Sequence, residues 1–62
     1  MEKVLWDFLF EDKESGEQFF VECKNMEECK KILSENDFEE GDLNFCGVFS
    51  VEEADILGYD TY

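Results

Sequence analysis

Almost all of the side chains that could do chemistry in this 62-residue chain are carboxylates. There are 18 Asp and Glu against five Lys, with no Arg and no His, and the formal net charge is −13. Without His, neither histidine-based acid–base catalysis nor a histidine-ligated metal is available. So few cations also argue against direct binding of nucleic acid, which depends on neutralising phosphates.

The negative charge is concentrated in the C-terminal half. Residues 1–31 hold nine acids and all five lysines, whereas residues 32–62 hold nine acids and no lysine. This half is predicted to present a nearly uninterrupted negative surface that suits a basic partner. A compact domain of this length is about 25–28 Å across, a span over which duplex DNA carries roughly 15 phosphates. The acids could therefore imitate DNA in a basic channel, or they could serve only solubility.

The residues predicted to contact such a partner lie in and around an acidic loop, residues 36–42, and in and just after a short predicted helix that begins at Ser50. They comprise two acidic groups and two aromatic side chains that fall outside the alternating core pattern, as possible anchors. The set is Glu35, Asp37, Phe38, Glu39, Glu40, Asp42, Glu52, Glu53, Asp55 and Tyr59.

No catalytic residue, metal site or cofactor is predicted. Residues 36–42 hold four carboxylates, but their spacing fits no EF-hand register, which leaves only weak divalent-ion binding open. A cysteine nucleophile would lack a histidine base, and a carboxylate pair would lack a sugar cleft. Cys23, Cys29 and Cys46 have no zinc spacing and are interpreted as reduced packing thiols of a cytoplasmic protein. We expect neither a signal peptide nor a membrane span.

Three segments alternate between apolar and polar residues, and each is predicted to form a strand. Residues 3–11 are apolar on both faces, which favours a central strand, and a polar loop at 12–16 leads into residues 17–24. The third strand is residues 43–49, with one face made of Leu43, Phe45, Gly47 and Phe49.

Two capping patterns predict two helices. Asn25 with Glu28 begins a helix that runs to about Glu35, and Ser50 with Glu53 begins a short one that Gly58 ends. The prediction is one α+β domain over residues 1–62, in the order ββαβα. Its three-stranded antiparallel sheet has the order 2-1-3, with the main helix on the Trp6/Phe8 face.

The opposite face of this sheet would be apolar at Leu5, Leu9 and Phe20. The short C-terminal helix, a partner, or a second copy in a homodimer could cover it. Self-association through this face supports an alternative function, that of a small structural or assembly protein.

The run Gly47–Tyr62, GVFSVEEADILGYDTY, resembles the ending of small uncharacterised proteins carried by phages and mobile elements of low-GC bacteria. With GEQFFVE at residues 16–22, this resemblance covers about half of the chain. In size, acidity and sheet-plus-helix build, the chain is similar to a single domain of the ArdA-type antirestriction proteins and to small anti-CRISPR proteins.

This similarity implies steric blocking of the DNA site of a nuclease. The predicted function is thus a non-enzymatic phage or mobile-element inhibitor that docks on a basic, nucleic-acid-binding surface of a host nuclease or defence complex.

Overall fold

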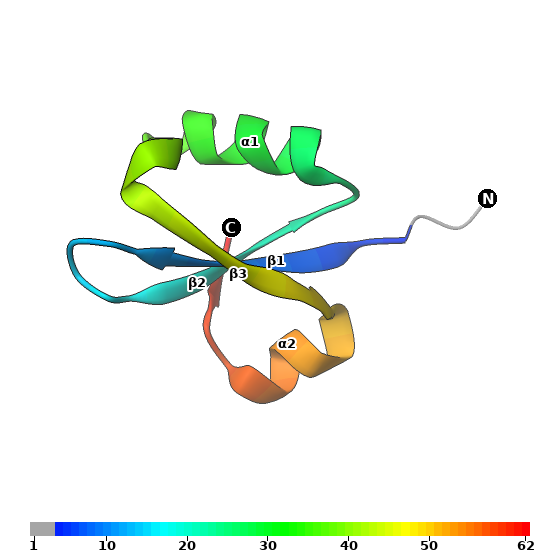
Figure 1. The fold of residues 1–62 in the computed structure, drawn as a ribbon. Coiled ribbons are helices and arrows are strands. Elements are labelled where there is room, and N and C mark those ends of the chain that lie inside the picture. Colours follow the sequence, from blue (N-terminus) through cyan, green and yellow to red (C-terminus); the bar gives the residue numbers. More distant parts are fainter. Residues whose placement is uncertain (1–3) are drawn as a thin grey trace.

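The computed structural model describes residues 4–62 and shows a four-stranded sheet with one helix on each face (Figure 1). The strand order is β3-β1-β2-β4, in which β1 runs antiparallel to β2 and β3, and β4 runs parallel to β2. The elements are β1 (Trp6–Asp12), β2 (Gln18–Cys23), α1 (Met26–Glu35), the short 3-10 helix η1 (Glu40–Asp42), β3 (Leu43–Ser50), α2 (Val51–Leu57) and β4 (Asp60–Thr61).

The α+β class and the central position of β1 are confirmed, but the predicted sheet is wrong in detail. The sheet is mixed rather than antiparallel, because the C-terminal tail adds β4 beside β2. Backbone bonds complete this edge: the Tyr62 amide donates to the Phe20 carbonyl at 2.8 Å, and the Glu22 amide donates to the Tyr62 carbonyl at 3.1 Å. A two-residue strand is too short to leave an alternating pattern in the sequence. The predicted start of the first strand, at residue 3, lies outside the described residues.

The central strand β1 is buried on both faces. Phe8 and Phe10 belong to the core beneath α1, whereas Leu9 belongs to a second core beneath α2. The α1 core consists of Phe8, Phe10, Phe19, Val21, Cys23, Cys29, Leu33 and Leu43, with Met26, Ile32 and Phe38 packed against it. The smaller α2 core consists of Leu9, Phe20 and Ala54, with Phe49 packed against it.

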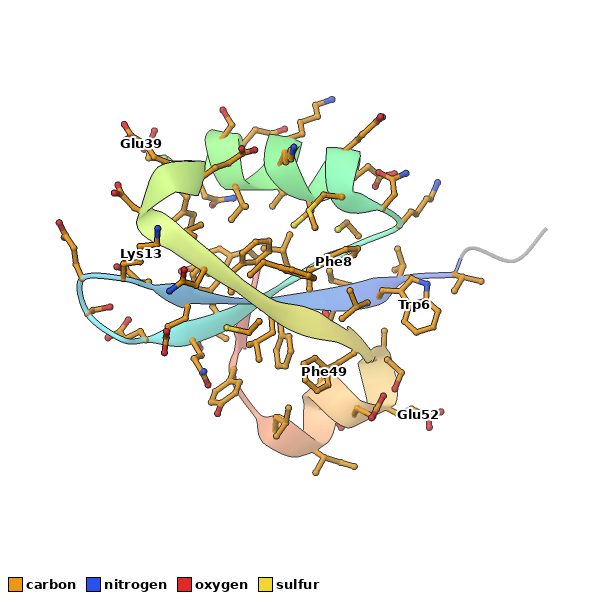
Figure 2. The ribbon with its side chains drawn as sticks, viewed as in Figure 1. Trp6, Phe8, Lys13, Glu39, Phe49 and Glu52 are labelled. Carbon is orange, nitrogen blue, oxygen red and sulfur yellow. The ribbon has the colours of Figure 1, made fainter. Side chains whose placement is uncertain are left out.

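A β-bulge in β3 overturns the prediction that Phe45 and Phe49 share a face. Leu9 pairs with Gly47 and Phe10 pairs with Phe45, so Cys46 is an extra residue that reverses the alternation. Phe45 therefore packs near Phe10 on the α1 side, with ring centroids 5.6 Å apart, and Phe49 lies on the α2 side (Figure 2). Gly47 has φ 154°, a conformation essentially reserved for glycine.

The helix α1 leaves part of its sheet face open. It packs on β2 and does not cover the start of β1 or the edge strand β3. Trp6, predicted to lie beneath this helix, is consequently 42% exposed, and Phe45 is 50% exposed.

The apolar face of Leu5, Leu9 and Phe20, for which the sequence leaves three covers open, is closed mainly by the C-terminal helix. Phe20 is fully buried and Leu9 is nearly so, because Ala54 of α2 and Phe49 pack against them. A second copy is therefore not needed to cover Leu9 and Phe20, and of the three residues only Leu5 keeps appreciable exposure. Ile56 of α2 points away from this core and is 85% exposed.

Both predicted helix starts are confirmed. The Asn25 side chain accepts a hydrogen bond from the Glu28 amide at 2.9 Å, and Ser50 with Glu53 forms a complete capping box. Helix α2 ends at Gly58 with φ 72°, as predicted.

Helix α1 ends in a Schellman motif that places a non-glycine residue in the left-handed region. Asp37 has φ 63°, the Phe38 amide donates to the Leu33 carbonyl at 2.9 Å, and the Asp37 amide donates to the Ser34 carbonyl at 3.2 Å. Glycine is preferred at this position because a side chain is strained there.

Asp37→Gly should therefore raise the free energy of unfolding by about 1 kcal/mol, measured by urea denaturation. Asp37→Ala removes the same charge but keeps a Cβ, so it should be less stable than the glycine variant. Equal stability of the two variants would show that the charge of Asp37, rather than its backbone conformation, lowers the free energy of unfolding.

Candidate functional site

The predicted partner-binding acids all lie at the surface. Glu35, Asp37, Glu39, Glu40, Asp42, Glu52, Glu53 and Asp55 are exposed. Among residues 4–62 the one ion pair joins Lys30 and Glu40, whose charged atoms are 4.0 Å apart. Most of the described carboxylates therefore have no cation in ion-pair contact.

These acids do not form the single surface that the sequence predicts. The group from Glu35 to Asp42 follows the C-terminal end of α1, whereas the group from Glu52 to Asp55 lies on α2, across the sheet. Glu39 and Glu52 accordingly lie at opposite ends of the molecule in Figure 2. One flat partner surface cannot contact both groups at once.

The structure instead joins the loop acids to the β1–β2 hairpin. The Lys13 amide donates to the Asp42 carbonyl at 3.0 Å, and its Nζ donates to the Gly41 carbonyl at 2.9 Å. We call the resulting cluster the acidic end, and it consists of Asp12, Glu14, Glu39, Glu40 and Asp42. The hairpin acids were not among the predicted site residues, although the antiparallel pairing of the first and third strands, which was predicted, already brings residues near 12 beside residues near 42.

Two of the surface acids also have structural roles. The Asp12 carboxylate accepts a hydrogen bond from the Glu14 amide at 2.8 Å, which shapes the hairpin turn. The Glu53 carboxylate accepts from the Ser50 amide at 3.3 Å and from the Ser50 hydroxyl at 3.0 Å, within the cap of α2. Glu53 is therefore less free to meet a partner than its neighbours.

Of the two aromatic anchors that were predicted, one is occupied inside the chain. Phe38 stacks on Phe19, with ring centroids 4.8 Å apart, and meets the edge of Tyr62 at 5.3 Å. These contacts half-bury the ring, so less of Phe38 is available to a partner. Tyr59 contacts Phe20 at 5.8 Å between centroids but remains exposed.

A hollow of about 490 Å³ lies between α2 and the sheet. Four of its lining residues are acids from three elements: Asp7 of β1, Glu22 of β2, and Glu52 and Asp55 of α2. Apolar and small residues complete the walls, among them Val51, Ala54 and Tyr59.

Asp7 is the unusual member of this pocket. It is only 2% exposed, and its Oδ1 has no hydrogen-bond partner among residues 4–62. Burial, followed by the charge of the paired Glu22, raises the pKa of the Asp7 carboxyl. Asp7 was not among the predicted site residues, although a lone acid between Trp6 and Phe8 in a predicted central strand was a usable signal.

Two of the three cysteine thiols are buried and one is exposed. Cys23 and Cys29 are free and buried in the α1 core, as predicted, whereas Cys46 is exposed at the bulge. Burial raises the pKa of the Cys29 thiol to about 12, with nearby Cys23 adding to the effect. Across residues 4–62, no three acids or cysteines gather in a way that could hold a metal ion.

Comparison of the chain with protein-family models, with curated proteins and with solved structures finds no match. Within residues 4–62, neither helix has the length and apolar character needed to cross a membrane.

Asp7→Asn should stabilise the protein at pH 7 by on the order of 1 kcal/mol, because it removes a buried charge. Since burial raises the pKa of Asp7 above its ordinary value of 3.8, the folded protein holds the proton more tightly than the unfolded chain. The loss of stability caused by the Asp7 charge is therefore complete at high pH and disappears as the pH falls toward 3.8.

The measurement is urea unfolding of both proteins between pH 3.5 and pH 7. Glu17→Gln is the matched control, since it removes one charge from an exposed position outside the helices and should show no comparable dependence on pH. A stability difference for Asp7→Asn that does not change over this range would contradict the prediction.

Proposed function

We propose that the protein is a non-enzymatic binding protein that docks on a basic, nucleic-acid-binding surface of another protein and blocks it. The partner class that fits is a host nuclease or defence complex, and the origin that fits is a phage or mobile element. The observation that carries the proposal is the acidic end, where the hydrogen bonds of Lys13 to Gly41 and Asp42 join the acidic hairpin to the acidic loop after α1.

The scale of the charge supports imitation of a duplex. The molecule measures 38 × 24 × 16 Å along its principal axes. Along its longest dimension, duplex DNA would carry on the order of 22 phosphate charges, at one per about 1.7 Å. The 18 carboxylates of this chain are comparable in number, although Asp7 is buried and the acids of α2 lie across the sheet from the acidic end.

Some of the acids are placed where they oppose folding. Glu35 and Asp37 lie at the C-terminal end of α1, where the helix dipole disfavours negative charge, and the last turn has no basic residue. Asp37 also occupies the left-handed conformation. Acids kept at such positions support a role in binding, because local stability does not favour them.

The chemistry of the side chains supports a function without catalysis. The chain has no histidine to serve as a base. The raised pKa of Cys29 keeps its thiol protonated, and so unreactive, at neutral pH.

The proposal is tested by reversing charges at the acidic end. Glu39→Lys with Asp42→Lys should slow association with the captured partner about tenfold or more, with the fold intact. The control pair, Glu27→Lys with Asp60→Lys, makes the same change in net charge, from −13 to −9, at exposed positions elsewhere. It should slow association much less.

The partner is captured from bacterial lysate on the immobilised protein, eluted with duplex DNA, and then tested against labelled duplex across a salt series. Mutually exclusive binding that weakens steeply with salt is the expected result. Simultaneous binding of DNA and protein, or equal effects of the two variant pairs, would overturn the proposal.

A second candidate function, self-association, is favoured by the edge strand β3. No residue from Leu43 to Ser50 is charged, in a chain whose residues are 37% charged. Within residues 4–62 no strand pairs with its outer edge, and Phe45 and Val48 are about half exposed beside that edge. Edge strands are usually protected by charges, so this edge is suited to pairing with a second copy.

Sedimentation across a salt series tests this candidate. We expect self-association to increase as salt screens the repulsion between chains of charge −13, and Val48→Lys to suppress it. Asn44→Lys is a less informative variant, because Asn44 and Val48 lie on opposite sides of the bulge. A wild-type protein that stays monomeric at high salt would exclude this function.

A further inference from the structure

The hollow between α2 and the sheet has the features of a binding site for a cation. Asp7 and Glu22 stand directly opposite each other on β1 and β2, and α2 adds Glu52 and Asp55. Like charges that face each other across neighbouring strands are unfavourable without a counter-charge. The pocket is therefore built at a cost that a bound cation would remove.

Asp7 supplies an independent indication of a missing ligand. Its side chain is almost completely buried, it lines this pocket, and its Oδ1 has no hydrogen-bond partner among residues 4–62. Buried acids are normally paired or hydrogen-bonded, because an unpaired buried charge is costly. Over the same residues, the one ion pair is that of Lys30, which lies on α1 across the sheet.

The chemistry of the walls distinguishes between kinds of cation. Among the described residues, the acids are not grouped closely enough to hold a metal ion. Apolar surface from Val51 and Ala54, and the aromatic ring of Tyr59, also line the hollow. Such walls suit a flat, weakly hydrated organic cation that can stack on a ring while donating several hydrogen bonds to carboxylates.

We propose that this pocket binds a guanidinium group, with Asp7 and Glu22 as its acceptors on the sheet and Tyr59 as its stacking surface. A volume of about 490 Å³ is within the range of small-ligand pockets and accommodates an arginine side chain. The source of this group in the cell is an arginine of the basic partner, and that assignment rests on the proposed function. A buried arginine would set the orientation of a complex whose long-range attraction comes from the acidic end.

The test is an NMR titration at low salt with N-acetyl-arginine amide, and in parallel with N-acetyl-lysine amide and with Mg²⁺. We expect saturable shifts at Asp7, Glu22, Asp55 and Tyr59 with the arginine compound, and weaker binding of the lysine compound. Asp7→Asn should weaken arginine binding by at least about tenfold, since the interaction lost is a charge-assisted hydrogen bond. Asp55→Asn, at the exposed rim, is a second variant that leaves the sheet unchanged.

Glu27→Gln is the matched control, because it makes the same change in net charge outside the pocket and should leave arginine binding unchanged. Equal weakening by Glu27→Gln and Asp7→Asn, equal affinity for lysine, or the absence of saturable binding would overturn the guanidinium site. Arginine-to-lysine changes in the captured partner then test the source of the group. If the free arginine compound does not bind, the proposal that the protein docks through the acidic end still stands. If the charge reversals do not slow association, the proposal of a guanidinium pocket still stands.

Discussion

Burial of β1 on both of its faces is the constraint on which the rest of the structure depends. A chain with charge −13 repels itself, so it stays compact only if it removes enough apolar surface from water. Phe8 and Phe10 on one side of β1, and Leu9 on the other, each require a cover. The two helices supply it, and the strands β2 and β3 pair with β1 along both edges, which makes β1 the centre of the molecule.

The bulge at Cys46 allows a single strand to serve both of these cores. A regular β3 would point Phe45 and Phe49 to the same side, and the α2 core would lose the contact of Phe49 with Phe20. The extra residue sends Phe45 toward α1 and Phe49 toward α2, at a glycine that accepts the required backbone conformation.

The acids that violate folding rules are the ones most informative about function. Asp37 is strained at a helix end that disfavours it, and Asp7 is buried without a partner in the central strand. Local rules are most often broken where a protein binds or reacts. In the proposed scheme, the exposed acidic end attracts a basic surface, and the buried carboxylate of Asp7 selects a cationic group from it.

The sequence by itself determined the elements and much of the sheet. Alternation located β1, β2 and β3, and the caps at Asn25 and Ser50, with Gly58, set the bounds of the helices, because these signals act between residues that are close in the chain. Two-sided hydrophobicity also placed β1 at the centre. The exposure of the predicted acids followed from their charge alone.

Only the tertiary structure decided which of these pieces meet. The bulge moved Phe49 to the other core, two residues of the tail became β4, and α2, rather than a second copy or a partner, closed the face of Leu9 and Phe20. The same pairing of distant segments separated the acids of α2 from those after α1, joined the latter to the hairpin, and enclosed Asp7 beside Glu22. These outcomes depend on contacts between residues far apart in the chain, and no local pattern of residue types records them.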